Sequence, residues 1–129
     1  MNTKRFQDKV VLVTGGNSGI GKAAALAFSR EGAKVVIAAR REKEGAEAVN
    51  EIKSQGGQAL FVKTDLRNAD DINHLFGVIK EKYATLHCAF NNAGVYPKMK
   101  KAASYSVSEF DEIMNINVKS VWQIGRAHV

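Results

Sequence analysis

The sequence predicts an α/β fold in which helices cover a parallel β-sheet. Short apolar runs alternate along the chain with amphipathic segments, which is the pattern of repeated strand–helix–strand units. The apolar runs lack polar alternation, so each strand is expected to be buried on both faces, as in parallel sheets. The 129 residues, 45% of them hydrophobic, are enough for one modest domain.

Four strands and four helices are expected in alternation. The expected strands are 9–14, 34–39, 58–63 and 86–90, and the expected helices are 19–31, 41–54, 69–82 and a last helix after Ser106. Asn68 can cap the third helix, and Ser106 with Glu109 matches a capping box. The spacing in the last helix predicts an inward face made of Phe110, Ile113, Met114, Val118 and Val121.

Composition excludes several classes of protein. A single cysteine, Cys88, excludes a disulfide framework and a cysteine-rich zinc site, so no metal is expected and a reducing, cytoplasmic setting is favoured. No apolar run has the length of a membrane span. Nineteen Lys and Arg against thirteen Asp and Glu give a net charge of +6. These basic residues are scattered and not interleaved with aromatic ones, so we expect neither a nucleic-acid nor a membrane partner.

A glycine-rich turn separates the first strand from the first helix. Residues 14–21 read TGGNSGIG. Gly15 can supply the tight turn, Gly19 can let a phosphate approach the backbone, and Gly21 can let the helix pack closely. Asn17 and Ser18 can add side-chain hydrogen bonds. A purely structural turn is the alternative, but the place between a buried strand and a helix favours binding of a dinucleotide pyrophosphate.

These residues resemble a known family. TGGNSGIG is similar to the TGxxxGIG motif of the short-chain dehydrogenases/reductases, and residues 91–94 (NNAG) resemble that family's motif after the fourth strand. Asp65 resembles its aspartate near the adenine ring. The resemblance runs from about 6 to 123 and implies a Rossmann-type doubly wound parallel sheet, here with about four strands in the order 3-2-1-4. The expected cofactor contacts are Gly15, Asn17, Ser18, Gly19, Ile20, Gly21, Asp65, Leu66, Asn92, Ala93 and Gly94.

The end of the second strand bears on the choice of cofactor. An acidic residue there binds the ribose 2′-hydroxyl of NAD, whereas a basic one suits the 2′-phosphate of NADP. This chain has Arg40 and Arg41 and no acid, so NADP is favoured over NAD. Alternatively, both arginines are solvated at the start of a helix, and Asp65 caps the approach to the next one.

The resemblance implies hydride transfer between a nicotinamide and a carbonyl or alcohol carbon, with a tyrosine, a lysine four residues later and a serine. Asn117 matches the family's catalytic asparagine, which holds a water of the proton relay; alternatively, its amide bonds main chain. Tyr96 and Lys100 have the tyrosine–lysine spacing, but Pro97 and the preceding NNAG turn place them in a loop. We therefore expect this chain to be an amino-terminal part that is inactive alone.

The last residues of the chain differ from the rest. Residues 1–123 are expected to form a partial NAD(P)-binding domain. Residues 124–129 (IGRAHV) are expected to be non-native, because they leave the family pattern and one back-translation reads like a sequencing adapter.

The full-length protein is expected to bind a small substrate and to form a homo-oligomer. A stand-alone regulatory dinucleotide-binding module without catalysis is the alternative, although 86–90 lacks the charge that protects an exposed sheet edge. A methyltransferase is disfavoured by Arg40 and the NNAG motif.

Overall fold

The computed structural model describes residues 3–128. Its sheet has four parallel strands in the order β3-β2-β1-β4, which confirms the expected order. The strands are β1 (Val10–Thr14), β2 (Lys34–Ala39), β3 (Gln58–Lys63) and β4 (Cys88–Phe90). β4 begins two residues later than expected. The reason lies at His87, whose Nδ1 accepts a hydrogen bond from the N–H of Val10, in place of a main-chain partner.

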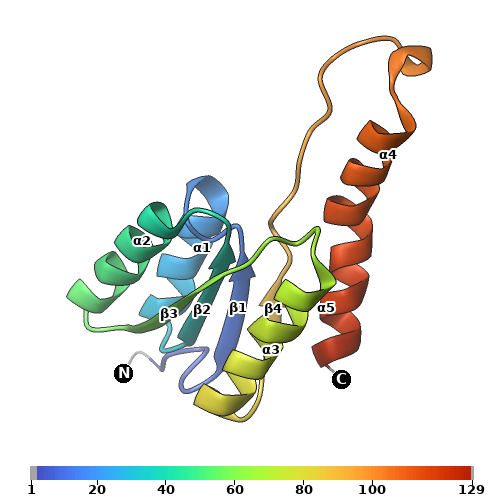
Figure 1. Cartoon of the computed structure of the whole chain (residues 1–129). Coiled ribbons are helices and arrows are strands. Elements are labelled where there is room, and N and C mark those ends of the chain that lie inside the picture. The colour runs from blue at the N-terminus through green and yellow to red at the C-terminus, as the bar shows by residue number, and fades with distance from the viewer. Residues whose placement is uncertain (1–2, 129) are drawn as a thin grey trace.

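The helices form where the amphipathic segments predict them. They are α1 (Gly19–Arg30), α2 (Glu42–Ser54), α3 (Ala69–Tyr83), α4 (Val107–Met114) and α5 (Ser120–His128), with a short 3-10 helix η1 (Ala102–Ser104). A π-helical turn, η2 (Asn115–Lys119), joins α4 and α5 into one rod (Figure 1). Both expected caps are present: Asn68 accepts hydrogen bonds at the start of α3, and Ser106 forms a capping box with Glu109.

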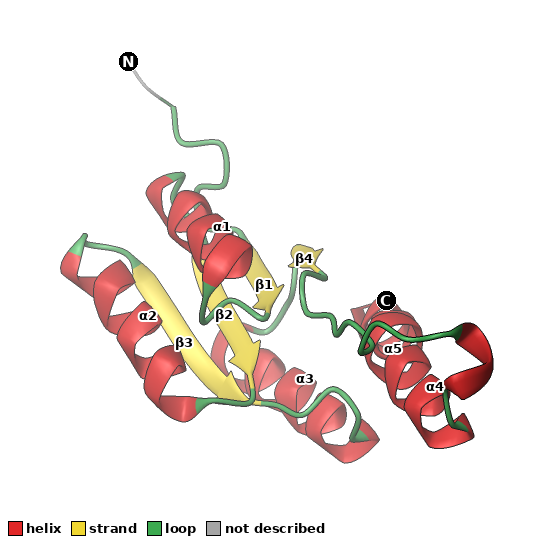
Figure 2. Ribbon diagram, turned by 90° about the horizontal axis from the view of Figure 1, so that it is seen from above, coloured by secondary structure: helices red, strands yellow, loops and turns green. Residues whose placement is uncertain are grey.

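The sheet is covered on both faces, as expected of a doubly wound fold. Successive residues of β1 point to opposite faces, so Val11 and Val13 pack with α1 and α2, whereas Val10 and Leu12 pack with α3 and α5. Figure 2 shows α1 and α2 on one side of the strands and α3 on the other. This double burial explains why the strands read as continuous apolar runs.

The prediction of which residues of the last helix face inward is wrong. The residues that the rod buries are Ile116, Ser120 and Ile124. A second stripe of apolar side chains faces outward and comprises Phe110 (58% exposed), Met114, Val118 and Trp122. Both stripes repeat every fourth residue, so periodicity alone does not tell which one faces the sheet. Of the expected inward residues, Ile113 and Val121 are half-buried.

Residues 124–128 of the segment expected to be non-native continue α5, and Val129 lies outside the described residues. Ile124 is 1% exposed and packs against the α3 side of the sheet, and a ring nitrogen of His128 lies 2.6 Å from the carbonyl oxygen of Leu86. The domain boundary at 123 stays a prediction.

The carboxyl ends of the four strands meet at one edge of the sheet. The glycine turn and the segments after β2, β3 and β4 therefore converge there, and α4 with the loop before it projects beyond that edge (Figure 1). Within residues 3–128, no helix is both long enough and apolar enough to cross a membrane.

Candidate functional site

A cleft of about 290 Å³ lies where the four strands end. Ligands of open α/β sheets bind in such a place. Most of the predicted cofactor residues line it, from four separate segments: Gly15, Asn17, Ser18, Arg40, Arg41, Asp65, Leu66, Asn92, Ala93 and Gly94. Gly19, Ile20, Gly21 and Asn117 are not among the lining residues.

Sequence reasoning missed five residues of the lining: Ala38, Ala39, Thr64, Val95 and Ile116. Four of them adjoin predicted contacts along the chain and could have been found by extending each strand end by a residue or two. Ile116 comes from the π turn of the rod, and no local pattern signals its place in the cleft.

The glycine turn has the geometry that its sequence predicts. Gly15 and Gly19 adopt positive φ angles of +66° and +54°, which side chains disfavour. A Cβ on Gly19 would meet nothing within 4 Å, so the space beside its backbone is open. A Cβ on Gly21 would lie 2.1 Å from the carbonyl oxygen of Gly15. Gly21 thus allows α1 to begin directly against the turn and Asn92, where the sequence predicted close packing on the strand.

The amino end of α1 is suited to an anion. Ser18 occupies the N-cap position, but its side chain makes no capping hydrogen bond, and the first turn of α1 carries no acidic residue. By contrast, α2, α3 and α4 each carry at least one acidic residue in their first turn. The first N–H groups of α1 and the positive end of its dipole therefore remain available to a phosphate. The residues present fit a dinucleotide pyrophosphate.

Hydrogen bonds tie the NNAG segment to the glycine turn. The side-chain amide of Asn92 donates to the carbonyl oxygens of Thr14 (3.2 Å) and Gly15 (3.4 Å). The N–H of Ala93 donates to the hydroxyl of Thr14 at 3.1 Å. Thr14 is buried, and sequence reasoning assigned it no role in the site. The two motifs of the family resemblance are therefore one structural unit at the ends of β1 and β4.

Two arginines provide positive charge after β2. Arg41 pairs with Glu44 one helical turn later, at 3.6 Å. Arg40 is exposed, and within residues 3–128 no ion pair or side-chain hydrogen bond engages it. Its guanidinium is therefore available to a ligand in the cleft.

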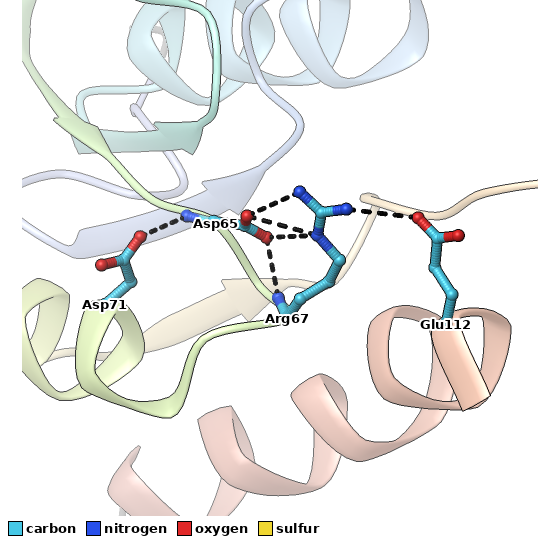
Figure 3. Close-up of polar contacts among 4 residues, drawn as sticks. All are labelled: Asp65, Arg67, Asp71 and Glu112. Carbon is cyan, nitrogen blue, oxygen red and sulfur yellow. Dashed lines mark hydrogen bonds and ion pairs between the residues drawn. The ribbon is translucent and has the colours of Figure 1, made fainter. Parts of the chain in front are cut away.

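Asp65, which follows β3, is held by Arg67 (Figure 3). The Arg67 side chain donates to the carboxylate through Nε (3.0 Å) and one terminal nitrogen (2.8 Å), and the Arg67 main-chain N–H donates at 3.0 Å. These hydrogen bonds lower the pKa of Asp65. The other terminal nitrogen of Arg67 reaches Glu112 of α4 at 3.3 Å. Sequence reasoning missed Arg67, although an aspartate that binds the N–H two residues later is a common turn signal.

Asn117 is hydrogen-bonded to the residue that follows the NNAG segment. Its Oδ1 accepts from the N–H of Val95 at 2.8 Å, and its Nδ2 donates to the carbonyl oxygen of Val95 at 2.9 Å. The amide therefore bonds main chain, as one of the two sequence interpretations expects. Tyr96 is 98% exposed and Lys100 binds Glu109, so this pair lies in the projecting loop and not in the cleft lining.

Comparisons with known proteins identify dehydrogenases among the relatives of this chain. A 3beta-hydroxysteroid dehydrogenase of Mediterraneibacter gnavus is 38% identical over 125 residues, which are 97% of this chain and 45% of that protein. A cyclopentanol dehydrogenase of Comamonas testosteroni is 39% identical over 123 residues, 95% of this chain and 49% of that protein. The chain spans about half the length of these curated relatives.

Solved structures share the fold. A metagenomic short-chain oxidoreductase in complex with NADP superposes with a TM-score of 0.91 at 29% identity, covering 95% of this chain and 55% of that one. A short-chain type dehydrogenase/reductase from Mycobacterium marinum gives 0.90 at 28% identity, covering 98% and 51%. The family model for short chain dehydrogenases matches residues 9–129. Because that match covers every strand and helix described above, this chain belongs to the short-chain dehydrogenase family.

Proposed function

We propose that this chain is the cofactor-binding part of an NADP-preferring oxidoreductase that transfers hydride between a nicotinamide and a carbonyl or alcohol carbon. Short-chain dehydrogenases bind nicotinamide cofactors, and one solved neighbour is a complex with NADP. The observation that carries the proposal is the uncapped amino end of α1 beside a cleft that Arg40 also lines. Within residues 3–128, Arg40 forms no ion pair.

Each part of the dinucleotide has a matching group in this proposal. The first N–H groups of α1, with Asn17 and Ser18, would hold the pyrophosphate. Arg40, helped by Arg41, would bind the 2′-phosphate, because a guanidinium fork matches phosphate geometry. Asp65 and Leu66 would lie beside the adenine.

The nicotinamide, when bound, supplies or accepts the hydride. Asn92, Ala93 and Gly94 would border that half of the cofactor from the β4 side. In the proposal, Asn117 fixes this border through Val95, and its role in a proton relay stays a prediction.

The chain alone is proposed to bind dinucleotide without turnover. Within residues 3–128, the formally matching pair Tyr96 and Lys100 is outside the cleft lining. A small carbonyl or alcohol substrate, a homo-oligomeric assembly and a cytoplasmic setting belong to the proposal for the full-length protein.

The test is a titration of the chain with NADPH and NADH, followed by nicotinamide fluorescence. We expect NADPH to bind more tightly, and Arg40→Asp to shift the preference toward NADH by roughly tenfold or more. Arg30→Asp is the control, because it makes the same charge change at the far end of α1. An unchanged preference in Arg40→Asp would remove Arg40 from the site.

The absence of turnover is tested with NADPH and a panel of aldehydes and ketones. We expect no NADPH oxidation above the rate of the buffer. Turnover that disappears in Tyr96→Phe would contradict the proposal and would place that pair in the chemistry.

A further inference from the structure

The hydrogen bonds around Asp65 leave its carboxylate little freedom. Arg67 binds both carboxylate oxygens, and Glu112 of α4 holds the far side of the same guanidinium (Figure 3). The N–H of Asp65 itself donates to a carboxylate oxygen of Asp71 at 2.8 Å. We call Asp65, Arg67 and Glu112 the Arg67 clamp.

Arg40 and Asp65 are neighbours at the cleft. Ala39, the last residue of β2, pairs with Lys63, the last residue of β3, and the N–H of Thr64 donates to the carbonyl oxygen of Ala39. Arg40 and Asp65 follow directly, and both line the cleft. Arg40 lowers the pKa of Asp65 through its charge, whereas Arg67 does so mainly through hydrogen bonds. The charge of Arg40 therefore acts on the Asp65 carboxylate, but the residue hydrogen-bonded to that carboxylate is Arg67.

This arrangement implies a competition between two arginines for one carboxylate. A free carboxylate at Asp65 would attract the guanidinium of Arg40 and would repel an incoming phosphate. We propose that Arg67 is a positioning residue for cofactor choice: by binding Asp65, it keeps Arg40 free for the 2′-phosphate of NADP. The inference rests on the proposed function, because it assumes that the cleft binds a dinucleotide.

The competition predicts a specific pattern of affinities. Loss of Arg67 should weaken NADP binding, since Arg40 must then leave Asp65 before it can bind phosphate. NAD lacks the 2′-phosphate, so its affinity should change little. Removal of the charge on Asp65 as well should restore the preference, because Arg40 then has no competing partner.

The experiment measures Kd for NADP⁺ and NAD⁺ by calorimetry on the full 129-residue chain. The variants are Arg67→Gln, Arg67→Lys and the double variant Arg67→Gln/Asp65→Asn. We expect Arg67→Gln to weaken NADP⁺ binding by about tenfold, which is the usual effect of losing one charge-assisted hydrogen bond. The Kd for NAD⁺ should stay within about twofold of the wild-type value. The double variant should recover the wild-type ratio of the two dissociation constants. The ratio for Arg67→Lys should lie between those of the wild type and Arg67→Gln, since lysine keeps the positive charge but not the two-pronged guanidinium geometry.

Arg5→Gln is the matched control. It removes an arginine that also pairs with a carboxylate, Glu31, but outside the cleft lining, and it should leave the ratio unchanged. Circular dichroism of each variant checks that it is folded; if Arg67→Gln does not fold, Arg67→Lys carries the ratio measurement.

Three outcomes overturn the inference. Equal weakening of both dinucleotides in Arg67→Gln would show a purely structural role. A double variant whose ratio of the two dissociation constants stays at the single variant's value would show that Asp65 is not the competitor. The ratio decides, because losing the proposed adenine contact of Asp65 would weaken both dinucleotides alike. A wild-type chain that binds neither dinucleotide would overturn the proposed function, and the clamp's role with it; this result differs from the first two, in which the wild type binds.

Discussion

Replacing Gly21 with alanine would put a methyl group where the glycine turn already lies. The added Cβ would be 2.1 Å from the carbonyl oxygen of Gly15 and 2.5 Å from the side-chain nitrogen of Asn92, and real Cβ atoms essentially never come within 3.0 Å of a neighbour. The nearer atom, the carbonyl oxygen of Gly15, belongs to the backbone and cannot move away by a change of rotamer. Either α1 or the turn must therefore shift by about 1 Å.

The expected cost follows from two opposing effects. Overpacking of a well-packed site costs about 1–3 kcal/mol, and we expect the upper end because backbone takes the strain. Alanine returns at most about 1 kcal/mol through its better helix propensity. The net loss in the free energy of unfolding is therefore about 2 kcal/mol, which lowers the melting temperature of a chain of this size by roughly 8 °C.

Urea and thermal denaturation, followed by circular dichroism at 222 nm, measure this loss. Gly77→Ala is the matched control, because Gly77 is exposed within α3 and an added Cβ there meets nothing within 4 Å. We expect Gly77→Ala to stabilise the chain by about 0.5–1 kcal/mol. If Gly21→Ala were as stable as Gly77→Ala, the close approach of α1 to the glycine turn would be refuted.

Three further predictions concern single side chains. Asn68→Ala removes the cap of α3 and should cost about 1 kcal/mol in urea unfolding, whereas Asn73→Ala in the exposed middle of α3 should cost almost nothing. Because the pKa of Asp65 is lowered in the folded state, its contribution to stability is complete above its unfolded pKa of about 4 and is lost as pH falls through the folded pKa. Unfolding free energies measured from pH 7 to pH 2.5 should therefore fall more steeply in the wild type than in Asp65→Asn. Asn117→Leu removes both hydrogen bonds to Val95, so the Val95 amide should exchange with deuterium at least tenfold faster by NMR; an unchanged rate would mean that other contacts hold this loop.

The strands and the first three helices could be predicted because their local pattern has one interpretation. A strand buried on both faces reads as a continuous apolar run, as in β1 and β2. The helix caps at Asn68 and Ser106 are equally local, since each acts on residues two or three positions away. The order of the strands followed from the family resemblance and is confirmed.

The rod of α4 and α5 could not be predicted to the same extent. Phe110 and Ile124 lie on different apolar stripes, and only the position of the sheet decides that Ile124 is buried and Phe110 exposed. The Arg67–Glu112 ion pair of the Arg67 clamp was missed for a similar reason. Arg67 and Glu112 are 45 residues apart along the chain, and a sequence does not indicate which distant charged residues form ion pairs with one another.

The first turn of α1, which has neither a side-chain cap nor an acidic residue, also makes the stability of this chain depend on the buffer. An anion that binds those N–H groups in the folded chain alone shifts the folding equilibrium by mass action, by about 2.7 kcal/mol when its concentration is a hundred times its Kd. Inorganic phosphate or sulfate at high concentration should therefore raise the melting point above that in chloride, with no dinucleotide present. Stabilities of glycine-turn variants are comparable only when every sample contains the same anion at the same concentration.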